Sequence, residues 1–497
     1  MRRSELSEIE KEKMDVEEKP KAGGGGGGGG GHGIPEGELL GTLALVGLIY
    51  FTAAGGAYGS ESVINSVGPL PVIIGHAIFP FCWSLPIGLA TVELATAYPT
   101  DGGVAVWAAL AFSEFWGFMG GYFSLVEGVV NLAVFPTVTL DYLLVFFNTN
   151  LSTSAAWFAK AGICCVVVAL NMQGVSFVGR SAYLLSILIN IPLTVMVFYG
   201  IFYVKDYSPW LESRQNDYDT NWTFFLGILV FNLSGYDNVG SVAGQLKNPG
   251  VTMPKAMIIA IVVGSVSFLV PLMYGAVIDP NYDNWRAGHF ATVGEQIGGK
   301  FLFYVMVVAA AMSRITHFMA ELCTNAFFLQ GMADERMVPP IFGWKHPVTR
   351  APWVSIVANF AVVLSMCTLS LPEIFEFSNA FTISGVILGL ITAIRLRITH
   401  PDVPRPYAIP VGTVGLCFFF APCFILSVYV IMCLSIFTTS VCIGVIGAGI
   451  VAHFAINESR LAGWPGMQGT VEDTTLFGHR GYTGEEAEPP AQGRSDV

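Results

Sequence analysis

Charged residues are scarce in this chain of 497 residues: Asp, Glu, Lys and Arg make up 12% of it, whereas hydrophobic residues make up 53%. Apolar stretches long enough to span a membrane recur from Leu39 to Phe454. The composition therefore predicts a polytopic membrane protein surrounded by a lipid bilayer. No basic patch with interleaved aromatic residues occurs and the net charge is -12, so nucleic acid is not an expected partner.

The chain also lacks the short motifs of common catalytic and metal sites. It has no Gly-x4-Gly-Lys-Ser/Thr phosphate loop, no zinc pattern and no Ser-His-Asp setting, so we expect neither an enzyme nor ATP-driven transport. All nine cysteines lie in apolar segments without a CxxC pair, which predicts packing residues. His317 and Glu321 alone are too few ligands for a metal site, so we expect no metal and no cofactor.

Both ends of the chain lack the apolar residues that a folded segment must bury. The first 36 residues have no secretory apolar core, and polyglycine fills positions 23–31. We expect disordered cytoplasmic tails at 1–36 and 457–497.

Twelve apolar spans fit between the tails. Their approximate ranges are 39–67, 70–97, 115–147, 155–171, 181–203, 222–246, 256–278, 300–330, 352–371, 374–396, 411–433 and 435–455. With the N-terminus inside, nine Lys and Arg residues fall in inner loops and four in outer loops. Because positive charge collects on the cytoplasmic side, both termini are predicted to be cytoplasmic.

The sixth span is interrupted at its middle by Ser234-Gly-Tyr-Asp237. An ionised carboxylate at membrane depth costs about 2.5 to 3.5 kcal/mol on insertion scales, so Asp237 needs a functional reason to be there. Non-helical backbone is tolerated at that depth only where it is buried in protein or lines a watery cavity. A discontinuous helix at the midplane is typical of a transporter's binding site.

The first span contains a similar interruption, with glycines at 55, 56 and 59 before Glu61. Glycine allows the backbone to leave helical geometry and to approach a ligand closely. A glycine-rich surface for helix packing is the simpler alternative for one such stretch. Two interruptions placed five spans apart favour paired discontinuous helices at the interface of a repeat.

Several motifs together resemble one family. They are Gly55-Gly-Ala-Tyr-Gly-Ser-Glu61, Asn131-Leu-Ala-Val-Phe-Pro136, Asn232-Leu-Ser-Gly-Tyr-Asp237, Met319-Ala-Glu-Leu-Cys-Thr-Asn325 and Arg405-Pro-Tyr-Ala-Ile-Pro410. These segments resemble the polyamine uptake transporters of plants and protists. That branch of the amino acid/polyamine/organocation superfamily is close to the L-type amino-acid transporters, and the resemblance extends from about Gly41 to Ile431.

The resemblance implies an all-α, LeuT-like fold with twelve transmembrane helices and discontinuous helices 1 and 6. The first five-helix repeat would cover residues 37–203 and the inverted second repeat 204–400, with helices 11 and 12 in 401–456. It also implies alternating access, with the substrate held between helices 1, 3, 6, 8 and 10.

Acids inside the predicted spans are the candidates for binding ammonium groups. They are Glu61, Glu127, Asp237 and Glu321, of which the last three are also candidates for proton coupling. Each has a structural alternative: a cap on the second half-helix for Asp237, a buried hydrogen-bond network for Glu127, an ion pair with Arg314 or His317 for Glu321, and the outer vestibule for Glu61. Glu93, near a span end, is expected to be structural.

The remaining candidates for substrate contact lie in or beside the two interruptions, or at the start of the third span. They are Gly55, Gly56, Tyr58, Tyr122, Phe231, Asn232 and Tyr236. An aromatic ring can contribute cation–π contacts to an ammonium group, although packing and lipid contact are the commoner roles. By resemblance, Phe231 has the place of the gating aromatic residue.

Three positions differ from the family pattern. Asn131 and Asn325 stand where plant members usually have acids, and Arg314 replaces a small polar residue. A cation facing a polycationic substrate would repel it, so Arg314 is expected to pair with Glu321 outside the site, or the substrate is a different one.

Together with the acids inside the spans, the resemblance implies a secondary transporter of the plasma membrane that imports polyamines of the putrescine, cadaverine and spermidine class, with protons as the expected coupling ion. One alternative is a transporter or exchanger of cationic or neutral amino acids, for which Arg314 is the best supporting residue. Another is a nutrient receptor that binds without translocating.

Overall fold

The computed structural model describes residues 40–461 apart from 148, 150, 215–220, 247, 287 and 368–370. The predicted tail 1–36 and residues 462–497 of the second predicted tail lie outside the described residues. Within the described part, the secondary structure is helical apart from one isolated bridge between Leu40 and Leu246.

The helices follow one another with short connections. They are α2 Thr42–Ala53, α3 Ser62–Val67, α4 Pro69–Phe79, η1 Pro80–Ser84, α5 Leu85–Ala97, α6 Gly103–Ala111, α7 Glu114–Leu132, α8 Val134–Phe147, α9 Thr153–Asn171, α10 Val175–Tyr203, η2 Ser208–Leu211, α11 Trp222–Asn232, η3 Asn238–Gln245, α12 Pro249–Ile278, η4 Tyr282–Asn284, α13 His289–Asp334, η5 Pro340–Gly343, α14 Trp353–Met366, α15 Leu371–Thr399, α16 Thr413–Met432 and α17 Ile436–Leu461.

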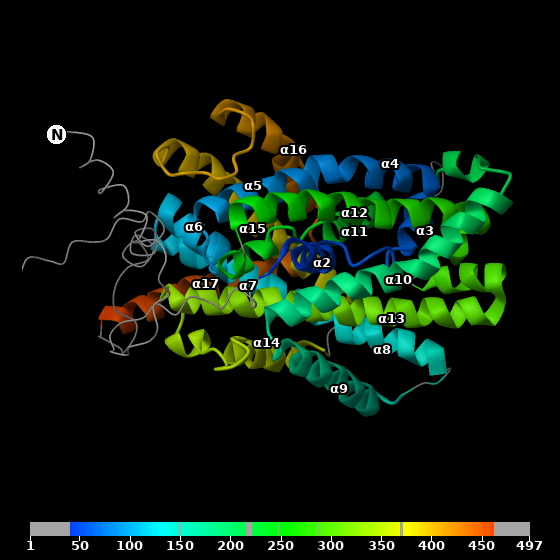
Figure 1. Cartoon of the computed structure of the whole chain (residues 1–497), viewed down its shortest axis with the longest axis horizontal. Coiled ribbons are helices and arrows are strands. Elements are labelled where there is room, and N and C mark those ends of the chain that lie inside the picture. Colours follow the sequence, from blue (N-terminus) through cyan, green and yellow to red (C-terminus); the bar gives the residue numbers. More distant parts are fainter. Residues whose placement is uncertain are drawn as a thin grey trace, which may run out of the picture. The chain divides into compact units, whose positions relative to one another are not determined.

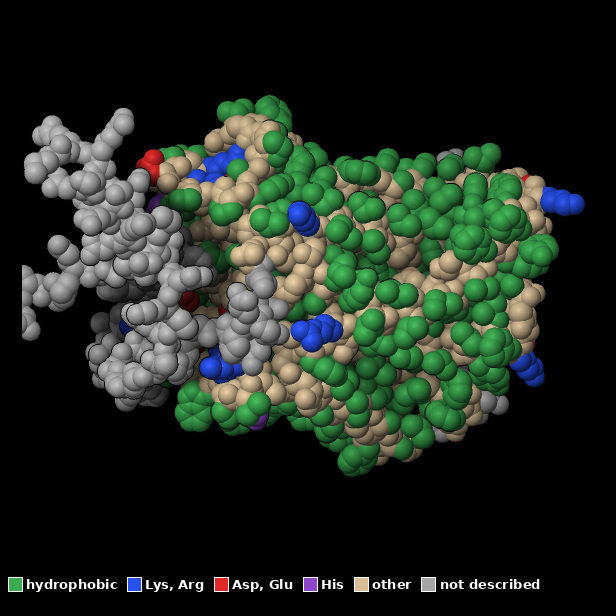
Figure 2. All heavy atoms as spheres, viewed as in Figure 1, with side chains coloured by type: hydrophobic (Ala, Val, Ile, Leu, Met, Phe, Trp, Pro, Cys, Tyr) green, Lys and Arg blue, Asp and Glu red, His purple; other side chains and the backbone are tan. Residues whose placement is uncertain are grey.

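Nine of the helical stretches in the described part are long and apolar enough to cross a membrane. Three shorter apolar helices accompany them, namely α2, α11 and α14. Most long helices run side by side, and hydrophobic side chains cover much of the face seen in Figure 2 (Figures 1 and 2). The chain is an integral membrane protein made of helices.

Burial separates central helices from peripheral ones. Every residue of α2 from Leu45 to Ala53 is buried, whereas only 11% of the apolar windows of α9 and α17 is buried. Helix α2 contacts α10, α12 and α13, which surround it. A helix that is apolar on all sides is expected at the centre of a membrane protein, because neighbouring helices cover every face.

The structure interrupts the helical chain at both places where the sequence predicts a break. Between α2 and α3 the backbone has positive φ at Gly55 (63°), Gly56 (87°) and Gly59 (88°), a region that residues with a Cβ rarely adopt. Between α11 and η3 the same geometry occurs at Gly235, with φ of 86°.

The second break touches the end of α2, directly before the first break. A Cβ at Gly235 would overlap the carbonyl oxygen of Thr52, so the second break can approach the end of α2 only through a residue without a side chain. Two further hydrogen bonds hold the second break: Ser84 donates to the carbonyl of Leu233 at 2.8 Å, and Trp83 Nε1 donates to Ser234 Oγ at 2.8 Å. These bonds replace part of the helical hydrogen bonding that the break gives up.

Candidate functional site

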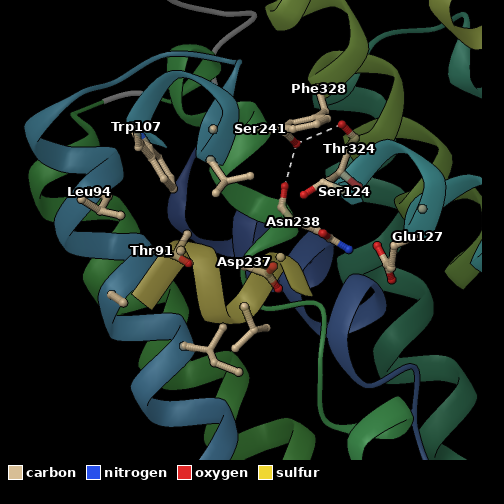
Figure 3. Close-up of a pocket in the computed structure, with 18 of the residues that line it drawn as sticks. Thr91, Leu94, Trp107, Ser124, Glu127, Asp237, Asn238, Ser241, Thr324 and Phe328 are labelled. Carbon is tan, nitrogen blue, oxygen red and sulfur yellow. Dashed lines mark hydrogen bonds between the residues drawn. The ribbon is translucent and has the colours of Figure 1, made fainter. Parts of the chain in front are cut away.

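A cavity lies beside the second break, between α5, α6, α7, α13 and α15 (Figure 3). The space within it, counted together with the adjoining open solvent, is about 680 Å³. We call it the central cavity. Its lining is Ile87, Ala90, Thr91, Leu94, Gly103, Val104, Trp107, Ser124, Glu127, Gly128, Asp237, Asn238, Ser241, Glu321, Thr324, Asn325, Phe328, Gly385, Val386, Gly389 and Leu390.

Three carboxylates from three separate elements line the central cavity: Glu127 of α7, Asp237 just before η3, and Glu321 of α13. Two small side cavities adjoin the same residues. Glu127 and Asp237 line the first side cavity, and Glu127 and Glu321 line the second. The acids therefore gather where the three cavities meet, although the described residues contain no group of acids, His or Cys arranged to hold a metal ion.

The partners of these carboxylates leave much of their charge uncompensated. Thr382 donates to Glu127 Oε1 at 3.4 Å, His317 Nε2 is 3.9 Å from Glu321 Oε1, and Asn131 is hydrogen-bonded to Glu321. Only 9% of Glu127 and 2% of Glu321 is exposed. Among the described residues, no Lys or Arg lines any of the three cavities. Such a site favours a cation, because buried negative charge needs a positive partner or a proton.

The part of the lining that α5, α6 and α15 supply is largely apolar and contains no acid among the described residues. It includes Leu94, Val104, Trp107, Val386 and Leu390. Figure 3 shows Leu94 and Trp107 on the far side of the cavity from Glu127. The cavity therefore combines an acidic side with a surface that suits a hydrocarbon chain.

The predicted site residues of the first break do not line the three cavities. Gly55 packs against α13, and Gly56 lies close to Tyr50. The Tyr58 hydroxyl lies 3.5 Å from the carbonyl of Ile189. These residues shape the break and its contacts with neighbouring helices.

Glu61 also holds the first break. Its carboxylate accepts hydrogen bonds from the backbone N–H of Gly59 at 2.7 Å and of Gly288 at 3.2 Å. The carboxylate thus connects the break to the segment that precedes α13, and it does not line the central cavity.

The aromatic candidates have different surroundings. Phe231 lines the second side cavity and meets Phe375 edge-on, with ring centroids 4.6 Å apart. The Tyr122 hydroxyl donates to the carbonyl of Val445 at 3.1 Å, so this residue faces α17. Tyr236 is fully buried, and its hydroxyl approaches α12 at Gly264.

Asn232 is the last residue of α11 and does not line the three cavities. Its buried Nδ2 has no hydrogen-bond partner among the described residues. The structure therefore places Asn232 at the break but away from the acids.

Arg314 has a different partner from the one expected. The sequence predicts an ion pair with Glu321, whereas the described residues show no ion pair between Arg314 and that acid; His317 lies beside Glu321, and Asn131 is hydrogen-bonded to it. Arg314 Nη2 instead donates to the carbonyl of Gly55 at 3.4 Å and to Ser313 Oγ at 3.3 Å. The guanidinium lies at the C-terminal end of α2, where helix carbonyls favour a cation, and outside the three cavities. It therefore does not face a substrate in the central cavity.

Several lining residues are missed by the sequence analysis, among them Thr91, Trp107, Ser124 and all four positions on α15. Two features of the sequence could have pointed to them: hydroxyl residues within apolar spans, and the pair Gly385 and Gly389 one turn apart. Ser241 shows what such a hydroxyl does.

Ser241 Oγ lies 2.6 Å from the carbonyl of Asn238 and 2.9 Å from that of Thr324 (Figure 3). The contact with Thr324 joins η3 to α13. It therefore holds the segment after Asp237 against the helix that carries Glu321.

The fold and the cavity together define a membrane transport protein, and comparison with known proteins gives its family. A family model described as "Amino acid permease" matches residues 40–456. The chain belongs to the amino acid permease family and is a transporter, not an enzyme.

Named relatives cover most of the chain. It is 34% identical over 427 residues to "Polyamine transporter RMV1" of Arabidopsis thaliana, covering 85% of this chain and 86% of that protein. It is 31% identical to "Polyamine transporter PUT1" of Oryza sativa subsp. japonica, covering 87% and 83%. It is 24% identical to "Probable agmatine/putrescine antiporter AguD" of Lactococcus lactis, covering 65% and 73%. The resemblance to polyamine transporters inferred from the motifs is confirmed.

Proposed function

We propose that this protein is a secondary active transporter that imports polyamines of the putrescine, cadaverine and spermidine class. The observation that carries the proposal is the set of three carboxylates, Glu127, Asp237 and Glu321, around one cavity that no Lys or Arg lines among the described residues. The names of the similar plant transporters support the same substrate class.

The transporter has twelve membrane spans in this proposal. The nine long helices and the three shorter apolar helices of the described part support that number. Residues 37–203 and 204–400 form two inverted repeats, with the breaks in the first and sixth spans, and 401–456 supply the last two helices. The contact of Gly235 with the end of α2 supports an interface between the repeats at the breaks.

Alternating access opens the central cavity to one side of the membrane at a time. Helix α6 lies at the end of the molecule where α5, α13 and α15 reach their C-termini, and we call this the α6 end (Figure 1). In this proposal the α6 end faces the cytoplasm. Both termini are then cytoplasmic, and the plasma membrane is the membrane that such an importer serves. Cargo enters from the opposite side and leaves past Trp107 and Phe328.

Protons couple to transport through Glu127, Asp237 and Glu321. Three carboxylates in one buried site repel one another, and either a proton or an ammonium group relieves that repulsion. A proton on one of the acids and a substrate ammonium beside the other two can therefore be bound at the same time. Release of both to the cytoplasm couples the entry of the substrate to the entry of a proton, and the empty carrier then returns to face the outside.

An amino-acid substrate is less well matched to the central cavity. Its carboxylate needs a cation or free N–H groups, and Arg314 is occupied with Gly55 outside the cavity. A receptor without transport is not favoured by any contact in the described part of the chain.

Uptake by the purified protein in lipid vesicles tests the proposal. Labelled putrescine should accumulate when the outside is more acidic than the inside, and spermidine should compete better than lysine, arginine or leucine. Uptake that is indifferent to the pH gradient would contradict proton coupling alone. Competition by amino acids but not by polyamines would contradict the substrate class.

A further inference from the structure

The acids of the central cavity come from only some of the elements that line it, and this distribution bears on how a diamine is recognised. Glu127, Asp237 and Glu321 come from α7, the second break and α13. Among the described residues, no acid of α5, α6 or α15 lines the cavity. A diamine with one ammonium among the acids therefore extends its other ammonium toward a surface that offers no carboxylate. This step rests on the proposed transport of polyamines.

Two aromatic rings also line the cavity, Trp107 of the acid-free α6 and Phe328 of α13, two turns along the helix from Glu321 (Figure 3). Both are buried, with 3% and 6% of their surface exposed. Trp107 Nε1 donates to the carbonyl of Tyr98 at 3.2 Å, so the polar group of the indole is already occupied. Trp107 can therefore contact a ligand through its aromatic ring but not through a free N–H group.

Both rings pack against glycines at the place where α6 meets η3. A Cβ at Gly240 would lie 2.7 Å from Trp107 Cη2, and a Cβ at Gly103 would lie 3.3 Å from the ring of Phe328. The same Cβ at Gly103 would lie 3.6 Å from the backbone of Gly240. The two rings therefore flank one contact between α6 and η3, and the approach of Trp107 depends on the missing side chain of Gly240.

We propose that Trp107 and Phe328 form an aromatic subsite for the second ammonium group of a diamine, and that this subsite sets a preference for diamines over monoamines of equal length. A buried ammonium without a partner is costly. An aromatic face attracts a cation, and Trp does so best. The methylene groups of the diamine lie along the apolar wall of α5 and α15.

The test compares two ligands that differ only at the far end. The affinities of purified protein for 1,4-diaminobutane and for butylamine are measured by calorimetry in the wild type and in Trp107→Leu. Trp107→Leu should bind 1,4-diaminobutane about 5- to 30-fold more weakly, while its affinity for butylamine changes less than about twofold. Trp107→Phe keeps an aromatic face and should recover most of the diamine affinity.

Other outcomes separate the subsite from simpler roles. Equal losses for both amines in Trp107→Leu, or an unchanged affinity for the diamine, would overturn the subsite and leave Trp107 as part of the apolar wall. Phe328→Leu gives the same comparison if the Trp107 variants do not fold. If the wild type binds neither amine, the proposed function itself fails, and the subsite fails with it.

Discussion

At the scale of single residues, the function depends on which carboxylates remain without a fixed cationic partner. Glu93 is paired, since Arg397 donates to both of its oxygens at 2.7 Å. Glu61 is bonded to backbone N–H groups. Asp237 and Glu127 instead line two cavities together. Position in the structure thus divides acids that look alike in the sequence into those held by fixed partners and those that line the central cavity.

Replacing Asp237 by Asn should weaken putrescine affinity about 10- to 100-fold, because it removes one charge from the acidic side of the cavity without changing its shape. Concentration dependence of uptake in vesicles measures the effect. Asp402→Asn is the matched control, because Asp402 lies exposed in the loop before α16. An unchanged affinity in Asp237→Asn would remove this residue from the site.

Asp101 lies outside the membrane spans, in the loop between α5 and α6, and connects that loop to η3. Its Oδ1 accepts from the N–H of Gly244 at 3.0 Å and its Oδ2 from Gln245 Nε2 at 2.6 Å. Burial raises the pKa of Asp101 to about 6; Lys345 and the two hydrogen bonds oppose the increase, and Asp334 adds to it. Free in water, an Asp has a pKa of about 3.9.

The folded state therefore binds a proton at Asp101 more tightly than the unfolded state does. The resulting stabilisation is complete below pH of about 4 and is lost as the pH rises through about 6. Between pH 5 and pH 7.5 the unfolding free energy of the wild type should fall, relative to that of Asp101→Asn, by about 1.4 kcal/mol. Chemical denaturation of both proteins at both pH values measures their unfolding free energies. A difference between wild type and Asp101→Asn that does not change with pH would contradict the raised pKa of Asp101.

At the scale of elements, the two breaks and the loops at the α6 end determine where the cavity forms. Asp101 holds the end of η3, and the N–H of Leu40 donates to the carbonyl of Gln245 at 3.0 Å. The half-helix after the second break is therefore fixed at its far end by the α5–α6 loop and by the segment that enters α2. Movement of η3 has to break these contacts.

Gly235→Ala should be severely destabilising. The residue has a φ of 86°, and a Cβ would overlap the carbonyl of Thr52, so both backbone strain and a collision oppose the substitution. Thermal unfolding of the purified protein, with putrescine uptake measured beside it, reports the loss. Gly444→Ala in α17 is the control, because a Cβ there meets nothing within 4 Å and should be neutral or slightly stabilising. Equal behaviour of the two variants would contradict the close contact of the second break with the end of α2.

A buried ion pair holds the loop after α15 against α5. Glu93 is 3% exposed, accepts two bonds from Arg397, and also accepts from the N–H of Ile409 at 2.9 Å. The Nε of Arg405 is 3.6 Å from the same carboxylate. The Arg-Pro-Tyr-Ala-Ile-Pro motif thus fastens its loop to a helix that lines the central cavity.

Glu93→Gln removes the negative charge that Arg397 and Arg405 share and leaves Arg397 with only the carbonyls of Ile409 and Val411, so it should lower the unfolding free energy, by at most about 3 to 5 kcal/mol. Thermal or chemical unfolding in detergent checks this. Glu295→Gln is the matched control, since Glu295 is exposed on α13. A stability equal to that of the control would show that the pair contributes nothing.

At the scale of the whole molecule, the twelve spans and the excess of Lys and Arg on one side predict that both termini lie in the cytoplasm. Short peptide tags added before Met1 and after Val497 test this in intact cells. Neither tag should be reached by an added antibody until the membrane is permeabilised. Labelling of either tag on intact cells would contradict the predicted orientation.

The sequence alone determines the class of this protein and the positions of its two breaks. An apolar chain with a carboxylate at mid-span requires a membrane protein with an interior polar site, and glycines at 55, 56, 59 and 235 mark where the helices cannot continue. The same cost of burying a charge makes Glu127 and Glu321, like Asp237, candidates for binding the substrate.

Only the tertiary structure decides which residues face the cavity. Trp107, Thr91 and the α15 glycines line it, whereas Tyr122 turns to α17 and Arg314 to Gly55. The sequence cannot distinguish these cases, because a central membrane helix is apolar on nearly every side and its pattern does not show which face meets a neighbour. Packing among the helices assigns each face, and with it each acid and ring, to the cavity or to the core.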